Sequence, residues 1–194
     1  IVVTSAQSSE ALLAIYRIAQ ERQARMIRIG SAAGDPAQAE VDAGYLPALS
    51  YRYQAQTRSP ERQTFTVITP EGSYSDLELS LAGLHQLENA TLALATLEIL
   101  RATGRTECAW DEAALREGLR DVYWSARMEI IGHQPMTVVD GAHNADSMQK
   151  LVQAVRDLFT YQHIWIVLGI NADKDLPGIV QSLAGVTGVI LARA

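Results

Sequence analysis

The chain has 194 residues, of which 48% are hydrophobic and 20% are charged, and its formal net charge at pH 7 is -6. This composition is typical of a globular protein and excludes a disordered one, and the acidic balance argues against nucleic acid or an anionic membrane as the partner, since both favour a basic surface. The single cysteine excludes an intrachain disulfide, and the absence of a signal peptide and of a long apolar run predicts a cytoplasmic protein.

The first thirty residues predict a strand, a helix and a second strand. Ile1–Thr4 and Met26–Ile29 are short apolar runs, and Gly30 closes the second one. Between them apolar residues recur at helical spacing after Ser8 or Ser9, either of which suits an N-cap. The apolar positions are Leu12, Ile15, Tyr16 and Ala19. A helix between two strands indicates a parallel pair.

The next segments predict a loop and a hairpin. Gly34–Leu49 is rich in small residues and has no clear period, so we expect a loop. Two alternating runs then flank Pro70-Glu71-Gly72 in "TFTVITPEGSYSDLELSL". This pattern predicts an antiparallel hairpin with one solvated face. Its apolar face carries Leu77, Leu79 and Leu81.

Two helices are expected to follow. "LHQLENATLALATLEILRATG" predicts a helix to about Thr103 that Gly104 ends, and its apolar middle indicates a core helix. Asp111 is a suitable N-cap for a second helix that runs to about Leu119. Cys108, between the two, is expected to be a small and partly buried hydrophobic residue.

A new unit is predicted from a boundary near Trp124 and Ser125. Its expected elements, in chain order, are a strand at Met128–Ile131, a turn at Gly132–Pro135, a strand at Met136–Asp140, a helix after Asn144, a buried strand in "HIWIVLGI", a helix at Leu176–Leu183 and a strand at Gly188–Ala192. The helix after Asn144 has apolar residues on one face, at Met148, Leu151, Val152, Val155, Leu158 and Phe159. Strands that alternate with helices indicate a doubly wound α/β fold.

The stretch "TVVDGAHNAD" places polar residues where a strand ends, which is where ligands bind in α/β sheets. Asp140 either contacts a nucleotide or a cation there, or it caps the loop. His143 is either a site residue or a solvated loop histidine. Asn144 is best interpreted as the N-cap of the next helix.

Two further polar residues have a functional and a structural interpretation. Arg127, at the expected boundary, either grips phosphate oxygens or pairs with a surface carboxylate. Asn89 follows His85 and Gln86 at the start of an apolar helix, and its amide either reads an adenine edge or satisfies the first helical turn.

The remaining polar cluster has a structural interpretation, and the sequence lacks the common phosphate-binding and metal-binding motifs. Asp173, Lys174 and Asp175 follow a strand and are interpreted as a self-neutralising surface cluster, although they too lie on the ligand side of the sheet. The sequence contains neither a Walker-type glycine loop nor a paired-histidine metal motif. No metal ligands are therefore assigned.

Together, "GLHQLENATLALA", "ARMEII" and "VVDGAHNADS" resemble the folylpolyglutamate synthase/dihydrofolate synthase family, which belongs with the Mur ligases. "LGINADKDL" is similar to a further segment of that family. The resemblance implies an α/β chain with the end of a central ATPase domain at residues 1–124 and the start of a Rossmann-like C-terminal domain at residues 125–194. It also implies an ATP- and Mg²⁺-dependent ligase that joins glutamate to dihydropteroate or folate through an acyl phosphate.

The same resemblance implies roles for single residues. Asn89 is similar to the asparagine that contacts adenine, and Arg127 to the arginine that reaches the ATP phosphates. Asp140 resembles an aspartate that contacts the nucleotide, and His143 lies beside it near the reacting centre. Ser125-Ala126 stand where the family usually has Pro-Gly, and Ala145 stands where it usually has proline.

We further expect the chain to be an inactive piece of a longer, monomeric enzyme with small-molecule substrates, because the P-loop and the Mg²⁺ ligands would precede Ile1. Two alternatives remain open at this point. One is a Mur-type ligase that adds an amino acid to a nucleotide-linked peptide, and the other is a non-catalytic nucleotide-binding module.

Overall fold

The computed structural model describes residues 1–105, 110–171 and 173–192, so the expectation for Cys108 lies outside the described residues. The chain forms two compact units. Unit 1 comprises Ile1–Thr57, Arg62–Ser80 and Leu84–Val122, and unit 2 comprises Arg58–Glu61, Leu81–Gly83 and Tyr123–Ala194.

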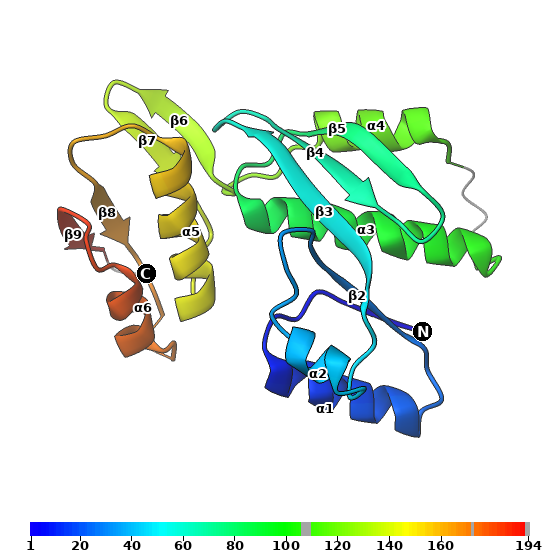
Figure 1. The fold of residues 1–194 in the computed structure, drawn as a ribbon. Coiled ribbons are helices and arrows are strands. Elements are labelled where there is room, and N and C mark those ends of the chain that lie inside the picture. The colour runs from blue at the N-terminus through cyan, green and yellow to red at the C-terminus, as the bar shows by residue number, and fades with distance from the viewer. Residues whose placement is uncertain (106–109, 172, 193–194) are drawn as a thin grey trace. The chain divides into compact units, whose positions relative to one another are not determined.

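Unit 1 contains a five-stranded sheet in the order β1-β2-β3-β4-β5 (Figure 1). The strands are β1 (Val2–Thr4), β2 (Met26–Ser31), β3 (Leu49–Arg58), β4 (Gln63–Ile68) and β5 (Ser73–Leu79). β1 and β3 both run parallel to β2, whereas β4 and β5 are antiparallel. The predicted strand–helix–strand unit and the predicted hairpin are both confirmed, with Leu77 and Leu79 buried on the inner face of the hairpin.

The helices of unit 1 are α1 (Ser9–Glu21), α2 (Gln38–Asp42), α3 (Leu84–Ala102) and α4 (Glu112–Asp121). Ser8 caps α1 by accepting a hydrogen bond from the backbone N–H of Ala11, and Asp111 caps α4 in the same way from Ala114. Both caps lie at the predicted positions because each side-chain oxygen satisfies a backbone donor that the first turn leaves unpaired.

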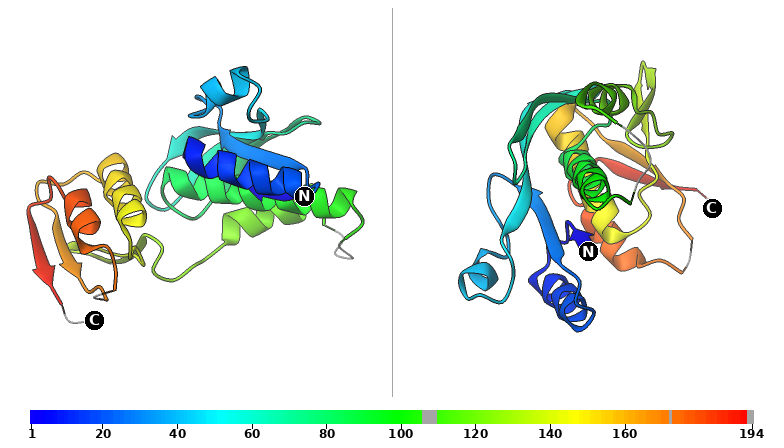
Figure 2. Two further views of the ribbon diagram at one scale, coloured as in Figure 1. Left: turned by 90° about the horizontal axis from the view of Figure 1, so that it is seen from below. Right: turned by 90° about the vertical axis from the view of Figure 1, so that its right-hand side faces the viewer.

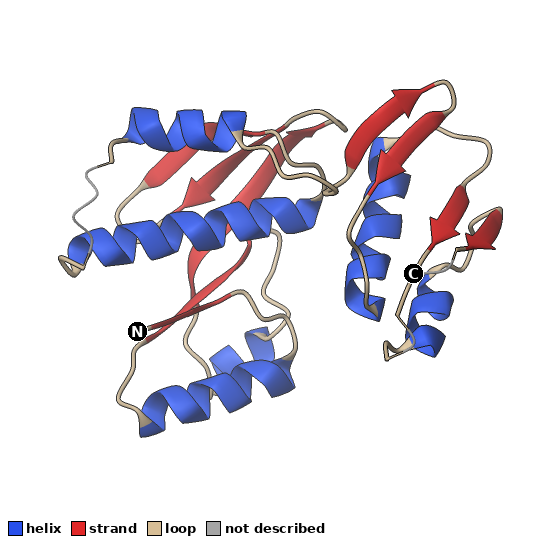
Figure 3. Ribbon diagram, turned by 180° about the vertical axis from the view of Figure 1, so that it is seen from behind, coloured by secondary structure: helices blue, strands red, loops and turns tan. Residues whose placement is uncertain are grey.

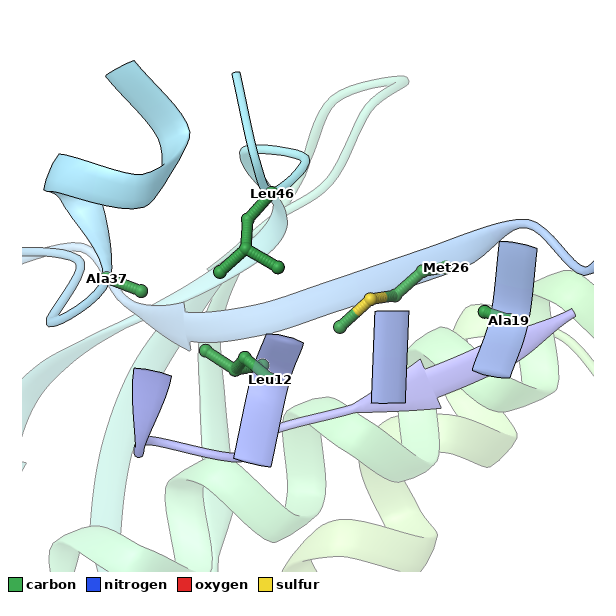
Figure 4. Packing of buried hydrophobic residues seen from close by; sticks show 5 residues of the cluster. All are labelled: Leu12, Ala19, Met26, Ala37 and Leu46. Carbon is green, nitrogen blue, oxygen red and sulfur yellow. The ribbon is translucent and has the colours of Figure 1, made fainter. Parts of the chain in front are cut away.

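Helices α1 and α3 lie on opposite sides of β2 (Figures 1 and 3). Successive strand side chains point to opposite faces, so β2 is buried on both. On the α1 side, residues of α1, β2 and the following loop form one apolar cluster (Figure 4). Its buried members are Leu12, Ala19, Met26, Ala37 and Leu46.

The loop predicted for Gly34–Leu49 is wrong in part, because α2 forms within it and β3 begins at Leu49. Helix α2 is only one short turn, so it is too short to show a helical repeat of apolar residues, and it has no side-chain N-cap. It therefore lacks both of the sequence signals from which a helix is predicted. Strand β3 was missed because its second half is exposed and polar, which hides the alternation that Tyr51 and Tyr53 begin.

Helix α3 buries one face and is not enclosed on all sides as its composition predicted. Leu84 and Leu97 are 39% and 37% exposed, although both are apolar. The buried face consists of Gln86, Leu87, Ala90, Thr91, Leu94 and Ala95. Its spacing follows the helical period, which the almost uniform hydrophobicity of the sequence concealed.

Two tyrosines of the sheet meet the carboxylate of Glu98 on α3. The hydroxyl of Tyr74 donates to the Oε1 atom of Glu98 at 2.7 Å. Burial, with the nearby Glu98 carboxylate, raises the pKa of Tyr51 and raises the pKa of Tyr74 to about 12. Both phenols therefore keep their protons to a higher pH in the folded chain than in the unfolded one.

We expect the free energy of unfolding to fall in alkali. Because the folded state binds the phenol protons more tightly than the unfolded state, stability is retained below about pH 10 and lost as the pH rises toward about 12. Urea unfolding across this range measures the loss, and Tyr74→Phe should make the pH dependence shallower. An equal slope in the variant would contradict the assignment.

Unit 2 contains two separate strand pairs. Its strands are β6 (Glu129–His133), β7 (Met136–Val139), β8 (Trp165–Leu168) and β9 (Gly188–Leu191), and its helices are α5 (Ala145–Leu158) and α6 (Leu176–Ser182). The β6–β7 pair is antiparallel and the β8–β9 pair is parallel. Helices α5 and α6 lie beside β8 and β9 (Figure 2). The turn between β6 and β7 is shorter than the predicted Gly132–Pro135, because β6 extends through Gly132 and His133, whereas β7 begins at Met136 as predicted.

The buried strand predicted in "HIWIVLGI" is wrong for one face of β8. Trp165 and Val167 are 64% and 69% exposed, whereas Leu168 is buried against α5 and α6. An apolar run predicts a strand with two covered faces, but the described residues of unit 2 cover only one. None of the described helices has both the length and the apolar character needed to cross a membrane.

Candidate functional site

Arg127 lies between two residues in the left-handed backbone conformation. Ala126 has a φ of 55° and Met128 a φ of 52°, values that non-glycine residues rarely adopt. The side chain of Met128 is buried, whereas that of Arg127 is exposed. The turn therefore anchors one side chain in the interior and presents the guanidinium between the two to solvent.

Two carboxylates hold this turn through its backbone. The Oε2 atom of Glu129 accepts the N–H of Ala126 at 2.9 Å, and the Oδ2 atom of Asp140 accepts the N–H of Met128 at 2.9 Å. The carbonyl of Ala126 in turn accepts the N–H of Gly141 at 2.8 Å. These contacts bind the strand-end loop to the turn and compensate the strained conformation.

Ala126 occupies the position at which the family that this chain resembles usually has glycine. The left-handed φ at this position explains the family's preference for glycine, because glycine adopts this conformation without a Cβ clash. We expect Ala126→Gly to raise the free energy of unfolding by about 0.5–1 kcal/mol, as measured by urea unfolding.

The matched control is Ala93→Gly on the exposed face of α3, where glycine should cost about 1 kcal/mol. Destabilisation by both substitutions would contradict the left-handed assignment of Ala126.

The guanidinium of Arg127 has an aromatic neighbour. Its Cζ atom lies 5.8 Å from the ring centroid of Trp124, a distance at which a cation is still attracted to the ring face. Trp124 is itself 62% exposed. The pair therefore forms an accessible cationic surface beside the strand-end loop.

The strand-end loop positions Asp140 and His143 close to this turn. Asp140 is half-buried, and its second oxygen, Oδ1, accepts the N–H of Ala142 at 2.8 Å. Each carboxylate oxygen has two lone pairs, so Asp140 retains capacity for another donor. The Nδ1 atom of His143 lies 2.9 Å from the carbonyl oxygen of Gly141. Since a carbonyl only accepts, Nδ1 carries the proton in this contact, which leaves Nε2 as the ring nitrogen that faces other partners.

Asn144 is the N-cap of α5, as predicted. Its side-chain oxygen accepts the N–H of Ser147 at 2.8 Å, and the hydroxyl of Ser147 accepts the N–H of Asn144, which completes a capping box. Ala145 is the first residue of the helix, a position at which proline is often favoured.

Asn89 lies on α3 in unit 1, apart in the sequence from the residues above. It is exposed, and its Nδ2 atom donates to the Oε1 atom of Gln86 at 3.2 Å. Among the residues that the structure describes, no protein group donates to its Oδ1 atom. The structure brings Arg127, Asp140 and His143 together in unit 2 and places Asn89 in unit 1.

The Asp173–Asp175 cluster supports its structural interpretation. Lys174 and Asp173 form an exposed ion pair at 3.2 Å, and Asp175 caps α6 by accepting the N–H of Gly178. A Cβ on Gly178 would collide with the Asp175 carboxylate, so the capping side chain would have to shift if another residue stood there. In the described parts of the chain, no three metal-ligating side chains come together.

The residues around the turn that sequence reasoning missed are Glu129, Trp124 and Tyr123. The hydroxyl of Tyr123 donates to the Oε1 atom of Glu129 at 2.8 Å. Hydrogen bonds from Ala126 and then from Tyr123 lower the pKa of Glu129. The available signal was the carboxylate two residues after Arg127 in "ARMEII", which stands at the start of a strand where nothing in the pattern requires a charge.

Residues 126–194 match the family model described as "Mur ligase, glutamate ligase domain". The chain is 37% identical to a folylpolyglutamate synthase of Lacticaseibacillus casei over 62% of its own length and 28% of the relative's. It is 30% identical to a dihydrofolate synthase/folylpolyglutamate synthase of Bacillus subtilis (strain 168), over 68% of this chain and 30% of that one. A solved complex of a folylpolyglutamate synthase with AMPPCP and folate superposes with a TM-score of 0.80 at 28% identity, over 99% of this chain and 42% of that chain.

This chain belongs to the folylpolyglutamate synthase/dihydrofolate synthase family. The mixed α/β architecture, with its parallel strands in both units, agrees with that membership. The chain spans less than a third of the length of the two curated folylpolyglutamate synthase relatives. The site around Arg127 lies at the beginning of the segment that matches the glutamate ligase model.

Proposed function

We propose that this chain acts as part of an ATP-dependent amide ligase that joins L-glutamate to dihydropteroate or a folate. The observation that carries the proposal is the exposed guanidinium of Arg127 on a turn that two carboxylates hold, at the start of a glutamate ligase domain. In such a reaction ATP phosphorylates a substrate carboxylate, and the amino group of glutamate displaces phosphate. The protein then contributes mainly position and charge.

The proposed roles follow from the chemistry of each side chain. Arg127 binds the phosphates of ATP and stabilises the transferring group, since its planar fork suits two phosphate oxygens. Asp140 accepts a ribose hydroxyl with its remaining lone pairs, and His143 offers Nε2 near the reacting centre. Asn89 reads the adenine edge with an amide that donates and accepts side by side.

We assign residues 1–124 to the end of the central ATP-binding domain and residues 125–194 to the start of the Rossmann-like C-terminal domain. The start of the glutamate ligase match at residue 126 supports this division. Mg²⁺ is proposed to accompany ATP, with ligands outside the described residues of this chain. The monomeric state and the cytoplasmic location remain predictions from the sequence.

The proposal is tested on the complete ligase, by which we mean a protein that contains this chain together with the remaining length of its relatives. Purified enzyme is assayed for ADP release with ATP, glutamate and either dihydropteroate or tetrahydrofolate. We expect release to require both the glutamate and the pterin substrate. Omitting either one serves as the control.

Two results would contradict this proposal and favour one of the two alternative functions. Turnover with a nucleotide-linked peptide and not with the pterins would indicate a Mur-type ligase. ATP binding without any turnover would indicate a non-catalytic module. The 194-residue chain alone is expected to show no turnover. ATP- and glutamate-dependent activity of this chain by itself would contradict the proposal that it is only part of the catalytic unit.

A further inference from the structure

Glu129 is the residue through which the first half of the Arg127 turn is fixed. Of its two carboxylate oxygens, Oε2 accepts the N–H of Ala126 at 2.9 Å and Oε1 accepts the hydroxyl of Tyr123 at 2.8 Å. The hydroxyl of Tyr123 also accepts a hydrogen bond from Ser125 at 3.2 Å. One side chain thus fixes both the residue that precedes Arg127 and the segment that leads to it.

The β6–β7 ribbon places Glu129 one step in register from Asp140. Glu129 pairs with Val139 in the antiparallel register, and Asp140 is the next residue after Val139. The two carboxylates therefore stand at the same end of one ribbon, where Glu129 accepts from the residue before Arg127 and Asp140 accepts from the residue after it. His133 pairs with Met136, so the short connection of this hairpin fixes the register of the two strands.

The intrinsic preferences of Ala126 and Met128 do not favour the backbone conformation that these carboxylates hold. Both residues that flank Arg127 have a positive φ without being glycine, a strained conformation that persists only where the surrounding contacts compensate for it. If one acceptor is lost, the backbone relaxes toward common φ values. The Arg127 guanidinium then points elsewhere, without any change in its own chemistry.

We propose that Glu129 is a positioning residue for the ligase reaction, acting through Arg127 by holding the left-handed turn that aims its guanidinium. This inference rests on the proposed function, because it assigns Glu129 a role only if Arg127 stabilises the transferring phosphate. Glu129 itself contacts no substrate. Its lowered pKa, caused by hydrogen bonds from Ala126 and Tyr123, keeps it an anion and a strong acceptor.

The test is a double-mutant cycle in the complete ligase with Glu129→Ala, Arg127→Ala and the double variant. We expect Glu129→Ala to lower kcat by about 10- to 100-fold, as a misplacement of about 1 Å does, and to leave the KM for glutamate within about 2-fold. In the Arg127→Ala background the same substitution should change kcat by less than about 2-fold, because nothing remains to be positioned. Equal effects of Glu129→Ala in both backgrounds would overturn the proposal and leave the role of Arg127 intact.

Two variants separate positioning from folding. Glu129→Gln keeps an acceptor for the N–H of Ala126 at roughly half the strength of a charged one, and we expect it to retain most of kcat. Asp146→Ala, which removes an exposed ion pair with Lys150 in the first turn of α5, should match the parent enzyme. If Glu129→Gln and Glu129→Ala lose kcat equally, the acceptor role is refuted.

Hydrogen exchange gives a readout that does not depend on activity. Mass spectrometry of the peptide that covers residues 123–131 should show faster exchange in Glu129→Ala than in Glu129→Gln. Unchanged exchange in both variants would overturn the structural basis of the proposal. Faster exchange combined with unchanged kinetics of Arg127→Ala would instead overturn the proposed function of Arg127, on which the inference rests.

Discussion

Replacing Arg127 by alanine in the complete ligase should lower kcat/KM by about 30- to 1000-fold, or about 2–4 kcal/mol. This loss is typical when one preorganised charge at a developing transition state is removed. The guanidinium is exposed and lies on a turn fixed at both ends, so it needs little reorganisation when the substrate binds. Steady-state kinetics with ATP and glutamate varied in turn measure the effect.

Two further variants sharpen this result. Arg127→Lys keeps the charge but loses the planar fork, so it should recover only part of the activity. Arg17→Ala removes an exposed arginine of α1 and should leave kcat/KM unchanged. If Arg127→Ala behaves like Arg17→Ala, then Arg127 is an ordinary surface residue.

The second large effect is expected at the ion pair between Arg28 of β2 and Asp35. The side chains are 2% and 5% exposed, and their atoms Nη2 and Oδ1 lie 2.6 Å apart. Arg28 also donates to the carbonyl of Pro47 at 2.7 Å, which ties β2 to the loop that leads into β3. Asp35→Ala should lower the free energy of unfolding by about 3–5 kcal/mol, because it leaves a buried guanidinium without a counter-charge.

A comparison of variants tests that explanation. The double variant Arg28→Met/Asp35→Ala removes the buried charge as well, so we expect it to be more stable than Asp35→Ala alone. Lys174→Ala breaks an exposed pair and should cost no more than about 1 kcal/mol. Urea unfolding measures all three, and a similar small cost for Asp35→Ala and Lys174→Ala would mean that the Arg28–Asp35 pair is not buried in solution.

The fold was predictable where local signals were strong. Ser8, Asp111 and Asn144 all cap helices at the predicted positions. A side-chain acceptor just before an amphipathic run is a strong signal, because it satisfies a backbone N–H that the first helical turn leaves unpaired. Strand β3 was not predictable, since its second half is polar and exposed and its first half is held in the sheet by parallel pairing with β2. The exposed face of β8 was mistaken for a buried one because hydrophobicity does not say which partner covers a strand.

The candidate site was predictable in its residues but not in its geometry. The sequence indicates Arg127 and Asp140 as polar residues at a boundary and at a strand end. It does not indicate that the carboxylate of Asp140 accepts the N–H of Met128, because that contact depends on a left-handed φ at a non-glycine residue. Glu129 was missed for the same reason. Its carboxylate accepts the backbone N–H of Ala126, and the pattern of side chains along a sequence does not predict such a backbone conformation.

The most direct test of the account uses oxygen isotopes. The complete ligase is supplied with a pterin substrate whose carboxylate carries ¹⁸O, together with ATP and glutamate, and the released phosphate is analysed by mass spectrometry. An acyl phosphate intermediate predicts ADP and inorganic phosphate that carries one ¹⁸O from the carboxylate for each amide formed. Unlabelled phosphate, or AMP with pyrophosphate, would contradict the proposed reaction and with it the role assigned to the Arg127 turn.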